Sequence, residues 1–392
     1  MSGNIPYVDR LRQQLVDAGR RRPAPPRFVW ATAKVGRVVV AALLLVGVAV
    51  PLFALRGLGS RSLSRTGAGA SSGEPPITGH LVTTTTKLQP GTLTLTVAFG
   101  DVWVVRVGDA TSNPPAGLVR LNGTTGTVEA TIPVNTVKRL EEHALVTAAG
   151  GLVWVSEGIG NGPQTISAVD PATNAVAKTV TVPAPIEGLA AFQGELWASV
   201  SPDGVTGSLV EIDPASARVV NIVPIGVTGP LSVAGDSLWI HYNGYAGTSV
   251  QLDPATGARG IKLDGTIGDV VLAGGLYWSI VTDDPANPEA TSIEAIDPAT
   301  GKTVVMLPAP RVGELLASSV GLWVWSGPGS LPDDSWDPNE PATVSLIDPA
   351  AQAFVGSPVP VDNPPSSFAV GDDALWITQY ETGNVTKVTL QT

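Results

Sequence analysis

The chain has 392 residues, of which 43% are hydrophobic and 15% are charged, and its net charge at pH 7 is −11. It contains no cysteine, which excludes disulfide bonds and thiolate metal or redox sites. Residues 1–76 hold eleven basic and three acidic side chains, so residues 77–392 carry a net charge of −19. A body this acidic lacks the basic surface that phosphate contacts require, and we therefore expect no nucleic-acid partner.

Residues 1–37 are predicted to form a cytoplasmic segment with one short amphipathic helix. Apolar side chains recur there at three- and four-residue steps, at Ile5, Val8, Leu11 and Leu15. Asn4 can cap this helix and Gly19 can end it. We interpret it as a solvent-facing or membrane-surface helix. The alternative is a docking helix for a cytoplasmic partner.

Residues 38–55 form an uncharged apolar run of eighteen residues, bracketed by Arg37 and Arg56. This length suits a single transmembrane helix. Eight basic residues precede the run, so the positive-inside rule places the N-terminus in the cytoplasm. The alternative is a cleaved signal peptide, but the leader is long, the run exceeds a usual signal-peptide core, and no convincing small-x-small cleavage site follows. We therefore expect an uncleaved, single-pass anchor in the cell membrane.

Residues 56–77 are rich in Gly, Ser, Arg and Pro, a composition typical of a flexible linker. Such a linker would carry residues 78–392 on the outer side of the membrane. The predicted protein is therefore an extracytoplasmic domain on a membrane tether.

Residues 78–392 repeat one pattern of about forty residues, which is the length of a four-stranded propeller blade. Each copy places a tryptophan in a short apolar strand after a tight turn, at Trp103, Trp154, Trp197, Trp239, Trp278, Trp323 and Trp376. An alanine stands five to seven residues before each tryptophan, where inner strands that converge on an axis need small side chains. We interpret the tryptophans as core rather than as a binding site, because every repeat needs its own core.

The third strand of each of the first six copies ends in an Asp-Pro turn or, in the first copy, in an Asn-Gly turn. These turns are Asn122-Gly123, Asp170-Pro171, Asp213-Pro214, Asp253-Pro254, Asp297-Pro298 and Asp348-Pro349. Proline presets such a turn, and the aspartate can accept hydrogen bonds from backbone N–H groups. A fourth strand follows each turn.

Seven tryptophan hairpins predict an all-β, seven-bladed β-propeller, preceded by the one transmembrane helix. The last copy stops after its third strand, Val385 to Leu390, whereas Leu81 to Leu88 has the character of a fourth strand. We therefore expect the ring to close by pairing the N-terminal strand with the C-terminal three. Closure would hide edge strands that otherwise invite aggregation.

Residues 166–183, with the sequence ISAVDPATNAVAKTVTVP, resemble the repeat of YVTN-type seven-bladed β-propellers. The broader group includes the streptogramin-lyase-like and quinoprotein-like propellers. The resemblance covers about residues 80–392 and implies the fold. It implies little about function, because the superfamily includes enzymes, sensors and scaffolds.

The third strand of a blade runs from the face with the variable loops to the opposite face. Both the C-terminus and the start of the N-terminal strand are then expected on that opposite face, where the linker attaches. The variable loops would point away from the membrane, and the longest span residues 326–342 and 281–291. We expect an unknown protein or small ligand to bind on this loop face.

The candidate binding residues lie in these two loops. Trp336 is a candidate interface anchor in an acidic loop. The acidic candidates are Asp333, Asp334, Asp337, Glu340, Asp283 and Asp284. Their oxygens suit calcium, but the spacing is not that of an EF-hand, so we assign no metal. The alternative is an acidic loop that is simply solvated.

His143 and His241 are the remaining binding candidates, because both can approach the loop face. Resemblance to streptogramin lyases implies a His/Glu set that acts with a divalent metal. His143, His241 and either Glu141 or Glu142 are the candidates for such a set, but they come from the second and fourth blades and do not match that family's site residue by residue. We therefore assign no catalytic residue and no cofactor.

No P-loop, Rossmann fingerprint, H-E-x-x-H or G-x-S-x-G motif occurs in the sequence. A binding module is accordingly favoured over an enzyme. The predicted function is ligand or protein binding, as a sensor or scaffold, at the bacterial cell envelope. The alternatives are a metal-assisted lyase or hydrolase of the streptogramin-lyase-like type and a purely structural envelope protein.

Overall fold

The structure is a computed structural model, and it describes residues 76–107, 117–134, 144–156, 162–242, 247–282, 284, 287, 290–328, 340–362, 365–371 and 373–392. Contacts divide the chain into two units, Met1–Ser71 and Ser72–Thr392, and every described residue belongs to the second. The predicted amphipathic helix and the predicted transmembrane run at 38–55 lie outside the described residues. Among those that are described, no helix is long and apolar enough to span a membrane.

The described residues form an all-β structure without a helix. Five sheets have four strands each. They are β2–β5 (Thr92–Ala98, Asp101–Arg106, Gly117–Asn122, Val128–Ile132), β6–β9 (Val146–Ala149, Leu152–Ser156, Gln164–Asp170, Ala175–Val182), β10–β13 (Ile186–Phe192, Glu195–Val200, Ser208–Asp213, Arg218–Pro224), β21–β24 (Val312–Ser318, Gly321–Ser326, Ala342–Asp348, Ala353–Val361) and the sheet of β25 (Ser367–Val370), β26 (Ala374–Thr378), β27 (Asn384–Gln391) and β1 (His80–Lys87).

The remaining described sheet has seven strands in the order β14 to β20. These are β14 (Leu231–Ala234), β15 (Ser237–Tyr242), β16 (Gly247–Leu252), β17 (Arg259–Ala273), β18 (Leu276–Thr282), β19 (Thr291–Asp297) and β20 (Lys302–Pro308). The long strand β17 pairs with β16 through residues 259–266 and with β18 through residues 266–273. It is therefore an outer strand in its first half and an inner strand in its second half.

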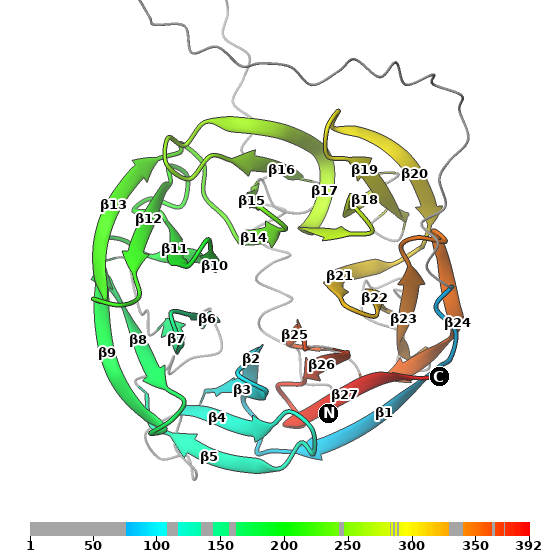
Figure 1. Ribbon diagram of the computed structural model, residues 1–392, viewed down its shortest axis with the longest axis horizontal. Helices are drawn as coiled ribbons and strands as arrows, with labels where there is room; N and C mark the ends of the chain where they lie inside the picture. Colours follow the sequence, from blue (N-terminus) through cyan, green and yellow to red (C-terminus); the bar gives the residue numbers. More distant parts are fainter. Residues whose placement is uncertain are drawn as a thin grey trace, which may run out of the picture. The chain divides into compact units, whose positions relative to one another are not determined.

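The sheets stand around a common axis (Figure 1). Each four-stranded sheet contributes one inner strand, and the seven-stranded sheet contributes two, β14 and the second half of β17. Each inner strand contacts the next, in the order β2, β6, β10, β14, β17, β21, β25 and back to β2. The ring of inner strands is therefore closed within residues 72–392.

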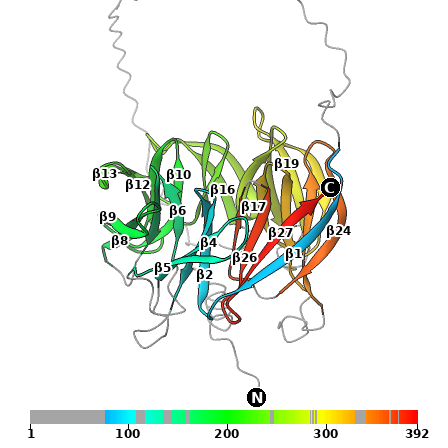
Figure 2. The ribbon, with the colours of Figure 1, turned by 60° about the horizontal axis from the view of Figure 1, so that its bottom comes forward.

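The first and last strands of the ring pair with each other, as predicted. β1 runs antiparallel to β27, from His80 opposite Gln391 to Lys87 opposite Asn384 (Figure 2). A hydroxyl–hydroxyl hydrogen bond of 3.0 Å joins Thr85 to Thr386 across this pair. The N-terminal strand thus completes a sheet whose other three strands are C-terminal.

The seven repeated tryptophans are core residues, which confirms the prediction. All are at most 4% exposed, and each lies in the second strand of its unit. Three of the indole N–H groups donate to the alanine carbonyl five residues earlier, at 3.0–3.1 Å: Trp103 to Ala98, Trp154 to Ala149 and Trp278 to Ala273. The indole N–H of Trp323 donates to Ser318 Oγ at 2.9 Å instead. The preceding inner strand therefore satisfies these buried indole donors.

The Asp-Pro turns form as expected and also join neighbouring sheets. Each aspartate accepts a hydrogen bond from the backbone N–H two residues on, as Asp170 does from Ala172 at 2.8 Å. The proline then packs over the inner hairpin of the preceding unit. A Cβ atom on Gly150 would lie 2.6 Å from Pro214, so only glycine fits beneath that turn.

Arg120 ties the β2–β5 sheet to the β6–β9 sheet. Its guanidinium forms a 2.6 Å ion pair with Asp101 and donates to the carbonyl oxygen of Pro171 at 2.6 Å and to Asn174 Oδ1 at 3.0 Å. It also lies over the Trp103 ring, 5.1 Å from the centroid. One side chain therefore connects the core of one unit to the turn of the next.

We predict that Arg120→Met lowers the free energy of unfolding by about 2–4 kcal/mol, because it leaves the buried carboxylate of Asp101 without its cation. Urea unfolding monitored by tryptophan fluorescence measures this change. Arg218→Met on the exposed side of β13 is the matched control and should change stability by less than about 0.5 kcal/mol. Equal effects of the two substitutions would contradict the assigned role.

Candidate binding site at the ring axis

Six of the nine residues predicted to bind a partner lie outside the described residues: Trp336, Asp333, Asp334, Asp337, Asp283 and His143. Their roles stay predictions.

The other three candidates have partners within the domain. Glu340 forms a two-point ion pair with Arg311, with nitrogen–oxygen distances of 2.7 and 2.8 Å. The Asp284 carbonyl oxygen accepts a hydrogen bond from the Asn287 N–H. His241 Nδ1 lies 3.1 Å from Ser249 Oγ and 3.4 Å from Thr266 Oγ1. Within the part of the chain that the structure describes, no group of three or more His, Asp or Glu side chains could hold a metal ion.

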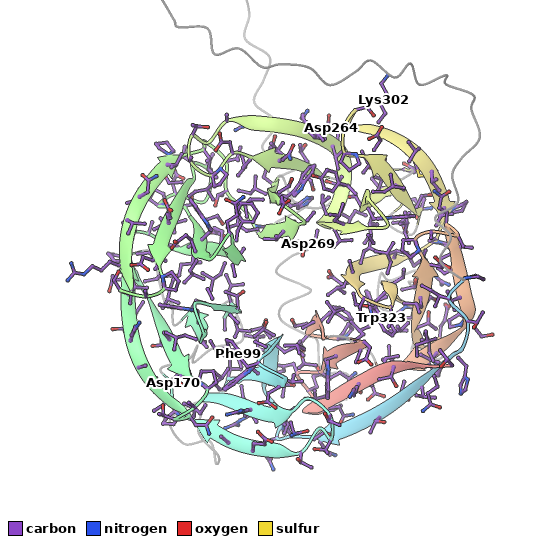
Figure 3. The ribbon with its side chains drawn as sticks, viewed as in Figure 1. Phe99, Asp170, Asp264, Asp269, Lys302 and Trp323 are labelled. Carbon is purple, nitrogen blue, oxygen red and sulfur yellow. The ribbon has the colours of Figure 1, made fainter. Side chains whose placement is uncertain are left out.

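Two carboxyl groups that sequence analysis did not single out lie on adjacent inner strands. Asp269 belongs to the inner half of β17 and Glu314 to β21, and these strands contact each other. Figure 3 shows Asp269 at the inner edge of the ring, beside the axis. We call Asp269 and Glu314 the axial pair.

A local irregularity of the backbone accompanies each member of the pair. The register of β17 against β18 shifts between Ile267 and Val271, and Gly268 adopts a φ of +71° within this bulge. The register of β21 against β22 shifts between Val312 and Glu314. A Cβ atom on Gly313 would lie 2.5 Å from the Trp325 ring, so glycine is required for this approach. Bulges of this kind redirect side chains next to functional sites.

The electrostatics of the axial pair favour the neutral, protonated forms. Burial raises the pKa of Asp269 to about 6. Burial also raises the pKa of Glu314, to about 8, with a further rise from the charge of Asp269 and an opposing hydrogen bond from the Leu315 backbone. Because the charge of Asp269 opposes the ionisation of Glu314, the two carboxyls lose their protons in separate steps.

The axial pair extends into a polar arc around the axis. Asp269 and Glu314 each precede the tryptophan of their repeat by nine residues, and the same position holds Ser367 and Thr94 in the next two units. The hydroxyl oxygens of Thr94 and Ser367 are 3.3 Å apart. The corresponding positions in the other three units are Leu145, Gly188 and Pro230. We call Asp269, Glu314, Ser367 and Thr94, from four consecutive inner strands, the polar arc.

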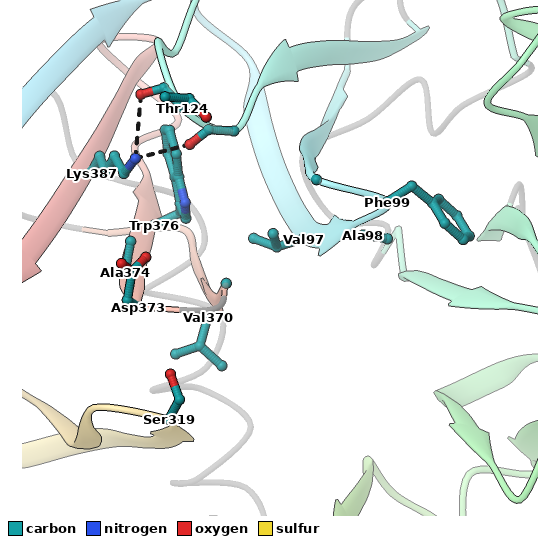
Figure 4. Close-up of a pocket in the computed structure, with 13 residues that line it drawn as sticks. Val97, Ala98, Phe99, Thr124, Ser319, Val370, Asp373, Ala374, Trp376 and Lys387 are labelled. Carbon is teal, nitrogen blue, oxygen red and sulfur yellow. Dashed lines mark hydrogen bonds between the residues drawn. The ribbon is translucent and has the colours of Figure 1, made fainter.

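A cavity of about 840 Å³ lies elsewhere on the axis wall, where the sheets of β2, β21 and β25 approach one another (Figure 4). Its walls include Val97, Val370 and Trp376. The ammonium group of Lys387 is held there by the carbonyl oxygens of Gly123 and Thr124, at 2.9 and 3.4 Å, and lies over the Trp376 ring. The Phe99 ring points away from Val97 (Figure 4). Among the described residues that line this cavity, the one cationic side chain, Lys387, is therefore already engaged in joining two sheets.

We predict that the free energy of unfolding falls as the pH rises from about 4 to about 8. The folded axial pair retains protons in this range that the unfolded chain, with ordinary carboxyl pKa values near 4, has lost. The contribution of the pair is thus fully present below about pH 4 and is lost as the pH passes the folded pKa values. Urea unfolding between pH 4 and 9 measures it, and Glu314→Gln should be more stable than the wild type at pH 9 but not at pH 4. Parallel curves for the two proteins would contradict this assignment.

Comparisons with known proteins identify the fold without naming a family. No protein-family model matches the sequence, and no curated protein matches it. Hydrazine synthase of Kuenenia stuttgartiensis contains a chain that is 15% identical, with a TM-score of 0.57 over 76% of this chain and 96% of that chain. A chain of the mitotic checkpoint complex is 13% identical, with a TM-score of 0.55 over 86% of this chain and 99% of that chain.

BamB from Moraxella catarrhalis is 14% identical over 77% of this chain and 85% of that chain, with a TM-score of 0.48. At such identities the likeness to hydrazine synthase and to the checkpoint complex shows the fold alone. The described residues therefore have the all-β fold of β-propeller proteins.

Proposed function

We propose that this chain is a membrane-anchored, seven-bladed propeller of the YVTN type that binds a ligand or a protein partner at the bacterial cell envelope. The observation that carries the proposal is the axial pair, Asp269 and Glu314, which the ring does not need for its own packing.

The pattern of strand pairing supports seven blades. The halves of β17 pair with different neighbours, so the seven-stranded sheet divides into two units of four strands that share β17. With the five four-stranded sheets, this gives seven units, each containing one buried tryptophan. The number agrees with the seven tryptophan hairpins of the sequence.

The cost of the axial pair supports a role in binding. Half-buried carboxyls without a cationic partner destabilise a fold. The other five repeats have Thr, Ser, Leu, Gly or Pro at the position nine residues before the tryptophan, so the fold does not require a carboxyl there. In contrast, the buried Asp101 has the cation of Arg120 beside it. A ligand that offers positive charge or several hydrogen-bond donors would supply the cationic partner that the axial pair lacks among the described residues.

A protein partner is also consistent with the predicted loop face. The mitotic checkpoint complex, which contains a chain of the same fold, is a protein assembly, although this is an analogy of fold only. The predicted partner face holds the loops at 281–291 and 326–342, and the described end of the second loop is fixed by the Arg311–Glu340 ion pair. A fixed loop base favours a defined docking surface.

The binding role predicts a charge-selective response to small cations. Spermidine and arginine should raise the melting temperature of the full-length protein at pH 7, whereas acetate and glucose should not, because only the cations complement the axial pair. Differential scanning fluorimetry in detergent measures the shift. Asp269→Asn combined with Glu314→Gln should abolish it. Glu187→Gln, on the inner strand β10, is the matched control and should retain it. If spermidine and arginine still raise the melting temperature of the double variant, the axial pair is not their binding site.

The membrane anchor predicts a defined topology. The full-length protein should stay in the membrane pellet after carbonate extraction, and a variant without residues 1–55 should become extractable, because residues 38–55 are the apolar span. Protease added to intact spheroplasts should degrade residues 78–392 and spare an N-terminal tag. Protection of the propeller in intact spheroplasts would contradict the extracytoplasmic placement.

A further inference from the structure

The cavity where the first and last units meet holds a positive charge that no described carboxylate balances. We propose that this cavity binds a small organic anion, with a carboxylate against Lys387 and an apolar body between Val97 and Val370. This site is separate from the axial pair and has the opposite charge preference, so it goes beyond the proposed function and does not depend on it.

Lys387 occupies the same place in the last unit as Arg120 does in the first. Each lies on the third strand of its unit, directly opposite the repeated tryptophan: Arg120 opposite Trp103, and Lys387 opposite Trp376. Each holds its charged group over that indole ring, at 5.1 and 5.2 Å from the centroid. Each also donates to backbone carbonyl oxygens in a turn of the neighbouring sheet. The two cations therefore make the same connection between sheets.

The two cations differ in their counter-charge. Arg120 forms a 2.6 Å ion pair with Asp101, which stands two residues before the tryptophan of its unit. In the last unit this position holds Ala374, a buried residue whose side chain ends at Cβ. Lys387 accordingly forms no ion pair with a described carboxylate. Two carbonyl oxygens and an indole ring solvate its charge without neutralising it.

The fourth unit shows that these two positions form a complementary pair. Gln251 lies opposite Trp239 and donates a 2.8 Å hydrogen bond to Ser237, two residues before that tryptophan. The third unit has two carboxyls at the same positions, Glu195 and Glu211, and thus presents no cation there. The last unit is the one in which a cation stands at one position and an apolar side chain at the other.

The cavity lies beside the place where the missing partner would stand. Ala374, Trp376 and Lys387 line it together, and Val97 and Val370 contribute apolar walls (Figure 4). Its volume of about 840 Å³ is within the range of small-molecule sites. An unbalanced charge and an apolar surface thus border one cavity, and a single ligand can contact both.

The cavity also offers a hydrogen-bond donor that the fold leaves unused. The indole N–H groups of Trp103, Trp154 and Trp278 donate to the alanine carbonyl five residues earlier. Gly371 holds that position in the last unit, and the Trp376 N–H has no acceptor among the described residues. A Cβ atom on Gly371 would lie 3.9 Å from Trp376 Nε1, and both residues line the cavity. A second donor favours a ligand that carries acceptor oxygens over one that carries a cation.

One carboxylate of the cavity opposes an anion. Asp373 lines the same space and is exposed, and no ion pair joins it to Lys387 among the described residues. The net charge of residues 77–392 acts in the same direction, but salt screens charges that lie more than about 10 Å away at 0.1 M. Removal of the Asp373 charge should therefore strengthen the binding of an anion.

Binding of 4-fluorophenylacetate to the full-length protein in detergent tests the site. Fluorine-19 relaxation of the probe measures its affinity, with protein-free micelles as the blank. The uncharged amide, 4-fluorophenylacetamide, has the same ring and should bind about tenfold more weakly, because it cannot balance the charge of Lys387. Equal affinity for the carboxylate and the amide would show that the cavity recognises only the ring, and would overturn the proposal.

Two substitutions place the binding at this cavity. Ala374→Asp supplies within the domain the carboxylate that Asp101 supplies in the first unit, so it should engage Lys387 and weaken binding of the probe at least about tenfold. Asp373→Asn removes the opposing charge and should strengthen binding about threefold. Lys302→Met, at an exposed lysine of the outer strand β20, is the matched control and should leave the affinity unchanged.

Circular dichroism reports whether Ala374→Asp folds. If it folds and binds the probe like the wild type, the site is disproved. If it does not fold, Asp373→Asn decides alone, since this exposed substitution preserves the packing, and an unchanged affinity then disproves the site. The double variant Asp269→Asn with Glu314→Gln should bind 4-fluorophenylacetate like the wild type, so failure of this site and failure of the axial pair are distinguishable.

Discussion

Every sheet of this ring depends on the antiparallel pairing of β1 with β27. A chain of packed sheets has two open ends, and each exposes unpaired backbone groups that recruit other strands. Here Leu81 to Thr86 lie opposite Leu390 to Val385, so the first strand completes the last unit. Lys387 strengthens the closure by bonding to the Gly123 and Thr124 carbonyls of the neighbouring sheet. The inner strands follow one another around the axis in chain order, and β25 contacts β2 next to this closure.

The repeated features could be predicted from the sequence because each copy satisfies the same local requirement. Trp103 and Trp278 are buried and hydrogen-bonded to an alanine carbonyl five residues earlier, and Asp170 caps its own turn. The axial pair could not be predicted in this way. Register shifts beside Gly268 and Gly313 interrupt the alternation of side chains, and the two residues belong to different sheets whose inner strands adjoin. Alignment of the repeats on their tryptophans was the available signal, since it places Asp269 and Glu314 at one position.

Acidic residues serve two opposite purposes in this domain. Asp101 and Glu340 face the arginines Arg120 and Arg311, and they stabilise connections between sheets or loops. Asp269 and Glu314 lie on adjacent inner strands, and burial raises the pKa of both carboxyls. The net charge of residues 77–392 does not distinguish these cases, because the distinction lies in the partner that each carboxyl meets.

The axial pair lies at a junction between two sheets, and the two sides of β17 differ in how their units are joined. The units on either side of β17 share one continuous sheet, and strain there would have to break a ladder of hydrogen bonds. The next junction, between β17 and β21, is held by side chains, with its apolar core set back from the axis. The charge of the axial pair therefore lies at a junction that side chains hold together, as they do at the other junctions between described sheets. The same two positions that make the carboxyls costly for stability place them at the axial edge of that junction.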